Sequence, residues 1–414
     1  MTSRDRMIIR DLAERVAEAA ARPEMEERRR LWYAQNSLDA PRPLVFVSPE
    51  GAWLELLPPG TMMCEDDDAR AIENGLRQRL YAADHFADDQ VCDAVFRVQP
   101  AVHQTGWGIG PRHIHSGAER GAYNWEPPIN TLDDIEKIQT PTYRYDPGAT
   151  ERYLAFATEL LDGIMEVRLH GTYWWALGLI DEWTMLRGIT NTFWDMVDQP
   201  EMVHRGMERL MEGRLAGLES LEQQGLLYLN NGNQYVGSGG FGFTDELPSE
   251  GYDGRVRLID MWGFCEAQTM SEVSPAMHEE FVLRYQLAIL DRFGLNCYGC
   301  CEPLHDKLDM LLARVPRMRR VSISPWADKR ISAEKIQDRC VYSWKPSPAP
   351  LAAITFDPEA VRSDVRETVA IAREHGCTLE IILKDTHTCN HEPERFDLWS
   401  RVAMEEAMAG AGVS

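Results

Sequence analysis

The stretch that decides the fold is SPAMHEEFVLRYQLAILDRFGLNCYGCCEPLHDKLDMLLARVPRMRRVSIS, residues 274–324. It contains helical and strand patterns in strict alternation. Ser274 before Pro275 is typical of a helix start, with a side-chain cap followed by proline at the first helical position. The short apolar runs at 295–300 and 319–324 are typical of buried strands. Alternating helices and strands with short connections predict a parallel sheet covered by helices.

The same rhythm extends over most of the chain. Strand patterns are predicted at residues 41–49, 91–102, 165–170, 226–230, 340–346 and 378–385, in addition to the two above. This number fits a (β/α)8 TIM barrel over residues 41–414, preceded by an N-terminal helical extension over residues 1–40. A doubly wound open sheet is the alternative, but no G-x-G-x-x-G motif follows the first strand, which argues against a dinucleotide site.

Composition excludes several classes of function. The 414 residues include 66 Asp and Glu against 43 Lys and Arg, which gives a net charge of −23. Such a chain is unsuited to contacting nucleic-acid phosphates or an anionic membrane surface. No apolar run approaches the length of a membrane-spanning helix. Nine cysteines without a secretory signal predict reduced thiols, and hence a cytoplasmic protein.

Metal-ligand side chains gather where two predicted strands end. On a regular strand Cys300 and Glu302 share one face, while Cys301 points the other way. Cys389 follows another strand, with His387 as an alternative ligand. Thiolate, carboxylate and imidazole are the ligands that Zn2+ prefers, so these residues predict a zinc site. The competing interpretation is packing, because free cysteine is among the most buried residue types.

Other strand ends carry aromatic and amide side chains that are suited to a ligand pocket. In a barrel, ligands bind at the carboxyl ends of the strands, and rings on such ends contribute apolar surface together with a polar atom. The residues predicted to bind substrate on this basis are His170, Trp174, Trp175, Asn231 and Trp262.

The C-terminal half resembles the uroporphyrinogen decarboxylase superfamily, especially its corrinoid-dependent methyltransferase branch. The resemblance covers roughly residues 255–410. It rests on the Ser-Pro-capped helix and short Cys-ending strand of residues 271–312, on VSISPWADKRISAEKIQDRCVYSWKPSPAPL, and on the closing segment DTHTCNHEPERFDLWSRVAMEEA. The arginine-rich signature of true decarboxylases is not found around the first strand, PRPLVFVSPEGAWLELLP, so decarboxylation is not expected.

The resemblance implies a zinc site made by a His-x-Cys pair and a distant Cys. In this sequence Tyr298 stands at the position of the family's His, Cys300 at its first Cys and Cys389 at its last. Because a phenol is a poor zinc ligand, Cys301 or Glu302 would replace the imidazole, and Tyr298 becomes a candidate for binding substrate.

The activity that the resemblance implies is methyl transfer to a corrinoid cofactor, cobalamin or a relative, on a partner protein. Zn2+ would polarise the oxygen of a small methylated donor, and a nearby acid would protonate it. Glu266, Asp385 and His391 are the candidate acids. The aromatic strand ends favour an aryl methyl ether, and hence O-demethylation. The alternatives are transfer from a methylcorrinoid to a thiol or tetrahydrofolate, and a zinc-free barrel that only binds a ligand.

Overall fold

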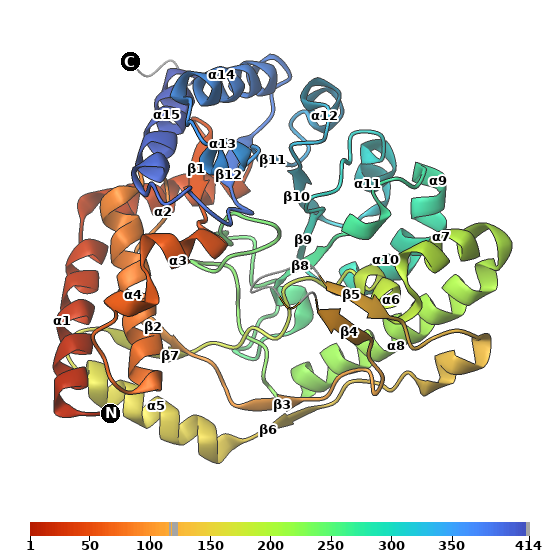
Figure 1. Cartoon of the computed structure of the whole chain (residues 1–414), viewed down its shortest axis with the longest axis horizontal. Coiled ribbons are helices and arrows are strands. Elements are labelled where there is room, and N and C mark those ends of the chain that lie inside the picture. Colours follow the sequence, from red (N-terminus) through yellow and green to blue (C-terminus); the bar gives the residue numbers. More distant parts are fainter. Residues whose placement is uncertain (116, 118–122, 411–414) are drawn as a thin grey trace.

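A computed structural model describes residues 1–115, 117 and 123–410, and its centre is a parallel sheet of six strands (Figure 1). Neighbouring strands follow the order β1-β12-β11-β10-β9-β8, and every pair in this sheet is parallel. The strands are β1 (Leu44–Val47), β8 (Trp262–Cys265), β9 (Leu295–Tyr298), β10 (Met318–Ile323), β11 (Val341–Trp344) and β12 (Leu379–Leu383). The predicted α/β class and the parallel pairing are therefore confirmed.

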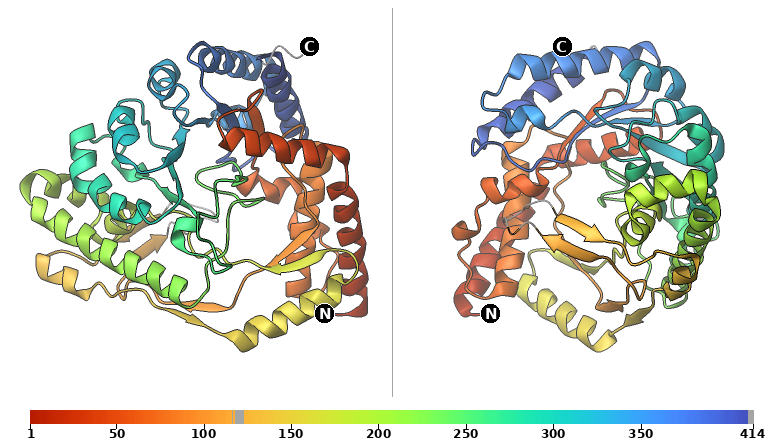
Figure 2. Two further views of the ribbon diagram at one scale, coloured as in Figure 1. Left: turned by 180° about the vertical axis from the view of Figure 1, so that it is seen from behind. Right: turned by 45° about the vertical axis from the view of Figure 1, so that its right-hand side comes forward.

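Helices cover the outer face of this sheet, as alternating patterns require. In Figures 1 and 2 they form an arc around the strands. The helix predicted from Ser274 and Pro275 begins there, because the Ser274 hydroxyl accepts the backbone N–H of Met277. The helices of the arc are α8 (Pro200–Gln223), α9 (Pro275–His278), α10 (Arg284–Leu290), α11 (Leu308–Arg314), α12 (Lys329–Ile336), α13 (Ala349–Ala352), α14 (Pro358–Glu374) and α15 (Glu394–Gly410).

The remaining strands form three separate pairs. β2 (Val95–Val98) runs parallel to β7 (Glu166–Leu169). The other two pairs are antiparallel: β3 (Val102–Gln104) with β6 (Tyr143–Tyr145), and β4 (Arg112–His115) with β5 (Tyr123–Glu126). The predicted closed ring of eight strands is therefore not confirmed, because the six-stranded sheet ends at β1 and β8 and the β2–β7 pair stands apart.

The strand predicted at residues 226–230 is wrong, and a side chain explains why. The amide of Asn230 accepts the backbone N–H of Trp262 at 2.9 Å and donates to the Trp262 carbonyl at 3.1 Å. These are the groups that a neighbouring strand beside β8 would use. Residues 226–230 run as an extended connection without strand pairing, and the sheet opens at this point.

The N-terminal helices lie on the side of the β2–β7 pair (Figure 2). Residues 1–40, predicted to be helical, form α1 (Ser3–Ala20) and α2 (Pro23–Asn36). α1 packs on α4 (Asp67–His85) and α5 (Pro147–Leu161) through a buried apolar cluster that includes Ile9, Leu12 and Leu76. The shorter α3 (Trp53–Leu56), α6 (Ile180–Arg187) and α7 (Ile189–Asp198) complete the helices. Within the described residues, no helix has the length and apolar character needed to cross a membrane.

Candidate active site

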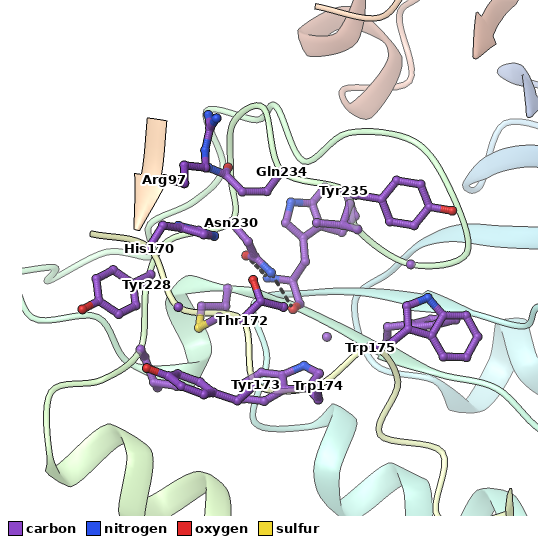
Figure 3. Close-up of a pocket in the computed structure, with 18 of the residues that line it drawn as sticks. Arg97, His170, Thr172, Tyr173, Trp174, Trp175, Tyr228, Asn230, Gln234 and Tyr235 are labelled. Carbon is purple, nitrogen blue, oxygen red and sulfur yellow. Dashed lines mark hydrogen bonds between the residues drawn. The ribbon is translucent and has the colours of Figure 1, made fainter. Parts of the chain in front are cut away.

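An aromatic cavity of about 660 Å3 lies beside the carboxyl end of β7 and along β8 (Figure 3). Four of the residues predicted to bind substrate line it: His170, Trp174, Trp175 and Trp262. Tyr173, Tyr228 and Tyr235 add three more rings. Polar side chains also line it: Arg97, His170, Thr172, Asn230, Asn233 and Gln234. A cavity of this size with aromatic walls and several polar groups suits a small planar ligand that carries polar substituents.

The structure places the other two predicted substrate-binding residues elsewhere. Asn231 lines a neighbouring cavity, and its amide donates to the backbone carbonyl of Leu247 at 2.6 Å. Tyr298 is fully buried in the core, where its hydroxyl donates to Gln286 and contacts the ring nitrogen of His278, both at 2.7 Å. Tyr298 is therefore held by core partners and is not among the residues that line the aromatic cavity.

A cluster of thiols around an ammonium group lies where β9 and β12 end. The Nζ of Lys384 is 3.4 Å from the Sγ of Cys300, and the hydroxyl of Ser238 donates to the same sulfur at 3.2 Å. The Cys301 sulfur lies 3.5 Å from Cys300 Sγ. Gly299 allows the chain to turn directly after β9, because its φ is +85°. Another residue would not fit there, since an added Cβ would lie 2.4 Å from Leu304.

Charge and hydrogen bonding make Cys300 the more acidic thiol of the pair. The hydrogen bond with the Cys301 thiol, the Lys384 ammonium and the Ser238 hydroxyl lower the pKa of Cys300 to about 7. The same contact with Cys300 raises the pKa of Cys301. Burial alone would lower the pKa of Lys384, but the negative charge of Cys300 raises it above its ordinary value. At pH 7 about half of the molecules therefore hold a thiolate beside an ammonium ion.

A second cavity, of about 520 Å3, connects this cluster to the aromatic cavity. Cys300, Lys384 and Asp385 line it, and so do Trp175 and Tyr235, which also line the aromatic cavity. The Nζ of Lys384 lies 6.0 Å from the centre of the Trp175 ring. A ligand in the aromatic cavity can therefore reach the ammonium group along the face of Trp175.

Behind the thiols lie two buried carboxyl groups, Glu302 and Glu266, with the half-buried Asp181 nearby. Glu302 accepts the backbone N–H groups of Ala267 and Cys300, each at 2.9 Å, and so joins the ends of β8 and β9. Burial, together with the charges of Asp181 and Glu302, raises the pKa of Glu266 to about 9. Glu266 is therefore protonated at neutral pH, as an acid must be, but it lies outside the lining of both cavities.

The predicted zinc ligands are brought together only in part. Cys300 and Cys301 are neighbours, but the Cys389 thiol donates to Glu55 at 3.2 Å and both oxygens of Glu302 accept backbone N–H groups. Over residues 1–115, 117 and 123–410, no group of three or more His, Cys, Asp and Glu side chains is arranged to hold a metal ion. The donor set therefore does not fit Zn2+ in this conformation.

Two of the predicted acids follow β12 but differ in position. Asp385 lines the second cavity and lies 3.5 Å from the Cys301 sulfur. His391 is exposed, as is His387, the alternative metal ligand. The backbone N–H of His391 is bound by Glu55, the carboxylate that also accepts the Cys389 thiol. Asp385 is thus the only one of the three predicted acids that meets a described cavity.

Sequence reasoning missed three residues of the cluster: Ser238, Tyr235 and Lys384. Lys384 had a usable signal, since it directly precedes Asp385 at the end of a predicted strand and a lysine there is expensive to bury. Ser238 and Tyr235 belong to the connection between α8 and β8, where no periodic pattern predicts which side chains turn inward.

Comparison with known protein families gives no match, and comparison with curated proteins gives none either. Among solved structures, the chain is similar to a methyltransferase from Methanosarcina mazei, with a TM-score of 0.50 and 11% sequence identity. The alignment covers 91% of this chain and 98% of that one. At this identity the likeness concerns the fold, which is shared over nearly the whole of both chains.

Proposed function

We propose that this chain is a methyltransferase that takes a methyl group from a small methylated donor, with an aryl methyl ether as the preferred class. The observation that carries the proposal is that the aromatic cavity meets the Lys384–Cys300 pair at Trp175 and Tyr235. The fold likeness to a methyltransferase and the sequence resemblance to the corrinoid-dependent branch both support it.

Lys384 would supply the main chemical assistance. When a methyl group leaves an aryl ether, negative charge develops on the oxygen, and a fixed ammonium group stabilises that charge. The raised pKa of Lys384 keeps its side chain charged, so it acts as a cation and not as the proton donor. Asp385, which lines the same cavity, is the candidate for protonating the product after transfer.

The methyl acceptor would be a corrinoid carried by a partner protein and would act as the second substrate. A reduced corrinoid is the strong nucleophile that cleavage of an unactivated ether requires, and the protein's part is to orient the methyl group toward it. The aromatic walls of the cavity provide that orientation by holding the ring of the donor in one plane.

Zinc stays a prediction from the resemblance. In the present conformation the Nζ of Lys384 lies 3.4 Å from the Cys300 sulfur, and the Cys389 thiol donates to Glu55. An ammonium ion 3.4 Å from the sulfur also offers the charge stabilisation that the metal was expected to supply.

The test is an anaerobic assay with cob(I)alamin and 4-methoxyphenol, which follows both hydroquinone and methylcobalamin. We expect formation of both products, and we expect Lys384→Met to lower the rate by about 100-fold or more. Lys335→Met is the control, because Lys335 is a partly buried lysine that is ion-paired with Asp309 but lies on α12. If neither product forms from a panel of aryl methyl ethers, the proposal fails.

Assays on the same purified protein distinguish the proposed reaction from two alternatives. Transfer in the opposite direction would consume methylcobalamin when a thiol or tetrahydrofolate is added. A barrel that only binds its ligand would quench the fluorescence of Trp174 and Trp175 with the ether but form no product. Neither alternative gives a role to the raised pKa of Lys384, which is why we favour ether cleavage.

A further inference from the structure

A third cavity, of about 730 Å3, has a chemical character unlike that of the rest of the molecule. Four arginines line it, namely Arg29, Arg97, Arg168 and Arg255, while the whole chain carries a net charge of −23. Among the residues that the structure describes, Asp93 is the only carboxylate in its lining. Such a concentration of guanidinium groups in an acidic protein indicates a site for an anion.

Two of the arginines lie so that their like charges destabilise the protein without a ligand. Arg97 on β2 lies directly opposite Arg168 on β7 in the register of the parallel pair. Like charges opposite each other on neighbouring strands are destabilising. Asp93 and Glu166 offset part of this cost, because each accepts hydrogen bonds from one of the two guanidinium groups. An anion between Arg97 and Arg168 would offset the remainder.

Of the other two arginines, Arg255 leaves its positive charge available to a ligand. The side chain of Arg255 donates to the carbonyls of Glu222 and Gln223, at 3.0 and 2.8 Å, at the end of α8. These are neutral partners, so the charge of Arg255 is not neutralised by them. Arg29 pairs with Glu26 through one terminal nitrogen and lies partly exposed at the rim.

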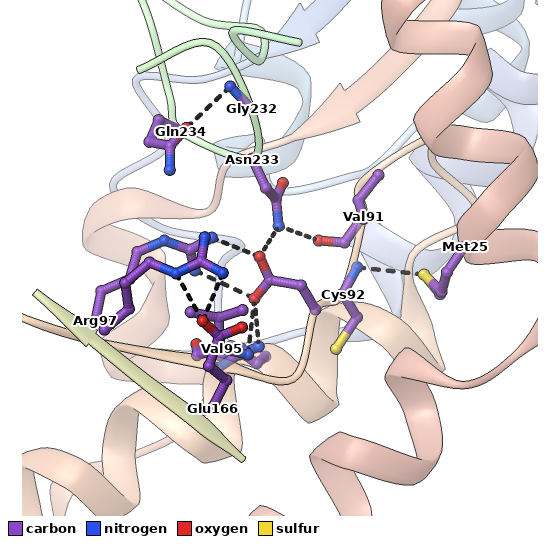
Figure 4. A network of polar contacts seen from close by, with 12 residues as sticks. Met25, Val91, Cys92, Val95, Arg97, Glu166, Gly232, Asn233 and Gln234 are labelled. Carbon is purple, nitrogen blue, oxygen red and sulfur yellow. Dashed lines mark hydrogen bonds and ion pairs between the residues drawn. The ribbon is translucent and has the colours of Figure 1, made fainter. Parts of the chain in front are cut away.

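A polar network holds the walls in place (Figure 4). The amide of Asn233 donates to both the Asp93 carboxylate and the Val91 carbonyl at 2.9 Å. Its own oxygen is buried without a hydrogen-bond partner among the described residues. Arg97 and Asn233 are therefore positioned by the protein before any ligand arrives, which lowers the cost of binding.

The pKa of His170 reflects the positive electrostatic potential of the arginine cavity. Burial, followed by the charges of Arg97 and Arg168, lowers the pKa of His170 to about 4. The ring is neutral at physiological pH and can donate or accept a hydrogen bond. His170 lines the arginine cavity and the aromatic cavity, as do Arg97, Leu227, Tyr228, Asn233 and Gln234. The two cavities are thus adjacent and share six lining residues, beside the opening that the missing strand at 226–230 leaves in the sheet.

We propose that the arginine cavity binds the anionic group of a ligand whose ring occupies the aromatic cavity. The ligand would then be an aromatic acid with a carboxylate or phosphate group, bound through the opening between β7 and β8. The inference rests on the proposed function in one respect: it assumes that the ligand is the methyl donor and adds that this donor carries a negative charge. Binding can be measured without methyl transfer, so the two proposals can fail separately.

The experiment compares a charged ligand with its neutral counterpart, by calorimetry and tryptophan fluorescence on the full chain. The ligands are 4-methoxybenzoate, the longer 3-(4-methoxyphenyl)propanoate and, as the neutral match, 4-methoxybenzyl alcohol. We expect at least one of the acids to bind about tenfold tighter than the alcohol or better. We expect Arg168→Gln and Arg255→Gln each to remove most of this difference while binding of the alcohol stays unchanged.

Arg330→Gln is the matched control. Arg330 is exposed and pairs with Glu374 much as Arg168 pairs with Glu166, but it lies on α12. Circular dichroism of each variant establishes that the fold is retained. Inorganic phosphate is tested as a competitor. Competition with the acids would identify the arginines as a general anion site, as proposed. The relative affinities of phosphate and the acids then distinguish free phosphate from an organic acid as the occupant. Equal affinity for acids and alcohol, no binding of either acid, or equal losses in Arg330→Gln would overturn the proposal.

Discussion

The ammonium nitrogen of Lys384 lies 3.4 Å from the sulfur of Cys300, so the carboxyl ends of β12 and β9 are joined by an ion pair inside the molecule. The cation stabilises the thiolate, and the thiolate keeps the cation charged in a largely buried place. Each group thus maintains the state of the other.

Removal of the Lys384 charge should make Cys300 an ordinary thiol. In the native protein we expect the rate of alkylation of Cys300 by iodoacetamide to rise with pH through a midpoint of about 7. In Lys384→Met the midpoint should move up, because the thiolate loses its cation. Mass spectrometry of the peptide that contains Cys300 measures the rate at each pH.

Lys335→Met again provides the comparison for this measurement, since its ion pair with Asp309 is remote from the thiols. Cys377 is an internal reference, because burial raises its pKa to about 12 and its alkylation should be slow in every variant. An unchanged midpoint in Lys384→Met would show that the ammonium does not control the thiol.

The sequence predicts which residues lie at the ends of strands better than it predicts which side chains contact each other. The strands at β1, β9, β10, β11 and β12 follow from short apolar runs between helices, and the ends of β9 and β12 are indeed where Cys300 and Asp385 come together. Parallel strands bring their carboxyl ends to one edge, so this neighbourhood follows from topology alone.

What the sequence could not predict depends on single contacts. Cys389 follows β12 as expected, but the Glu55 carboxylate from α3 accepts its thiol and turns it away from Cys300. Asn230 replaces a strand with one side-chain amide, which opens the sheet beside β8. No periodicity records such contacts, because each involves residues that lie far apart in the sequence.

Loss of the Trp175 ring should weaken binding of aryl ethers without harming the fold. Trp175 is 50% exposed, lines both cavities and faces Lys384. We expect Trp175→Ala to raise the Kd of 4-methoxyphenol about tenfold, since stacking on an aromatic face contributes about 1–2 kcal/mol. Titration by calorimetry measures it. Trp326→Ala is the control, because Trp326 is 75% exposed and lies outside the described cavities. A similar loss in both variants would remove the special role of Trp175.

Replacement of Cys389 distinguishes the zinc prediction from the present geometry. The resemblance makes Cys389 a metal ligand, whereas its thiol here donates to Glu55. We therefore expect Cys389→Ser, which keeps a donor at this position, to leave both metal content and demethylation rate unchanged. Cys300→Ser should lower the rate, because the thiolate that helps to keep Lys384 charged is lost. Elemental analysis of the two variants beside the native protein is the measurement. Zinc that is present in the native chain and lost in Cys389→Ser would establish a different conformation of this loop.

Glu266→Gln should stabilise the protein increasingly as the pH rises. Burial raises the pKa of Glu266 to about 9 in the folded state, while the unfolded chain releases this proton near pH 4.5. Between these values the folded state binds one more proton, so the native stability falls by about 1.4 kcal/mol per pH unit on account of this group. Glutamine cannot titrate, and its amide imitates the protonated acid. Urea unfolding at pH 5, 6.5 and 8 should therefore show a gap that widens with pH, whereas Glu405→Gln, on the exposed face of α15, should show none. A gap independent of pH would mean that Glu266 is already ionised in the folded protein.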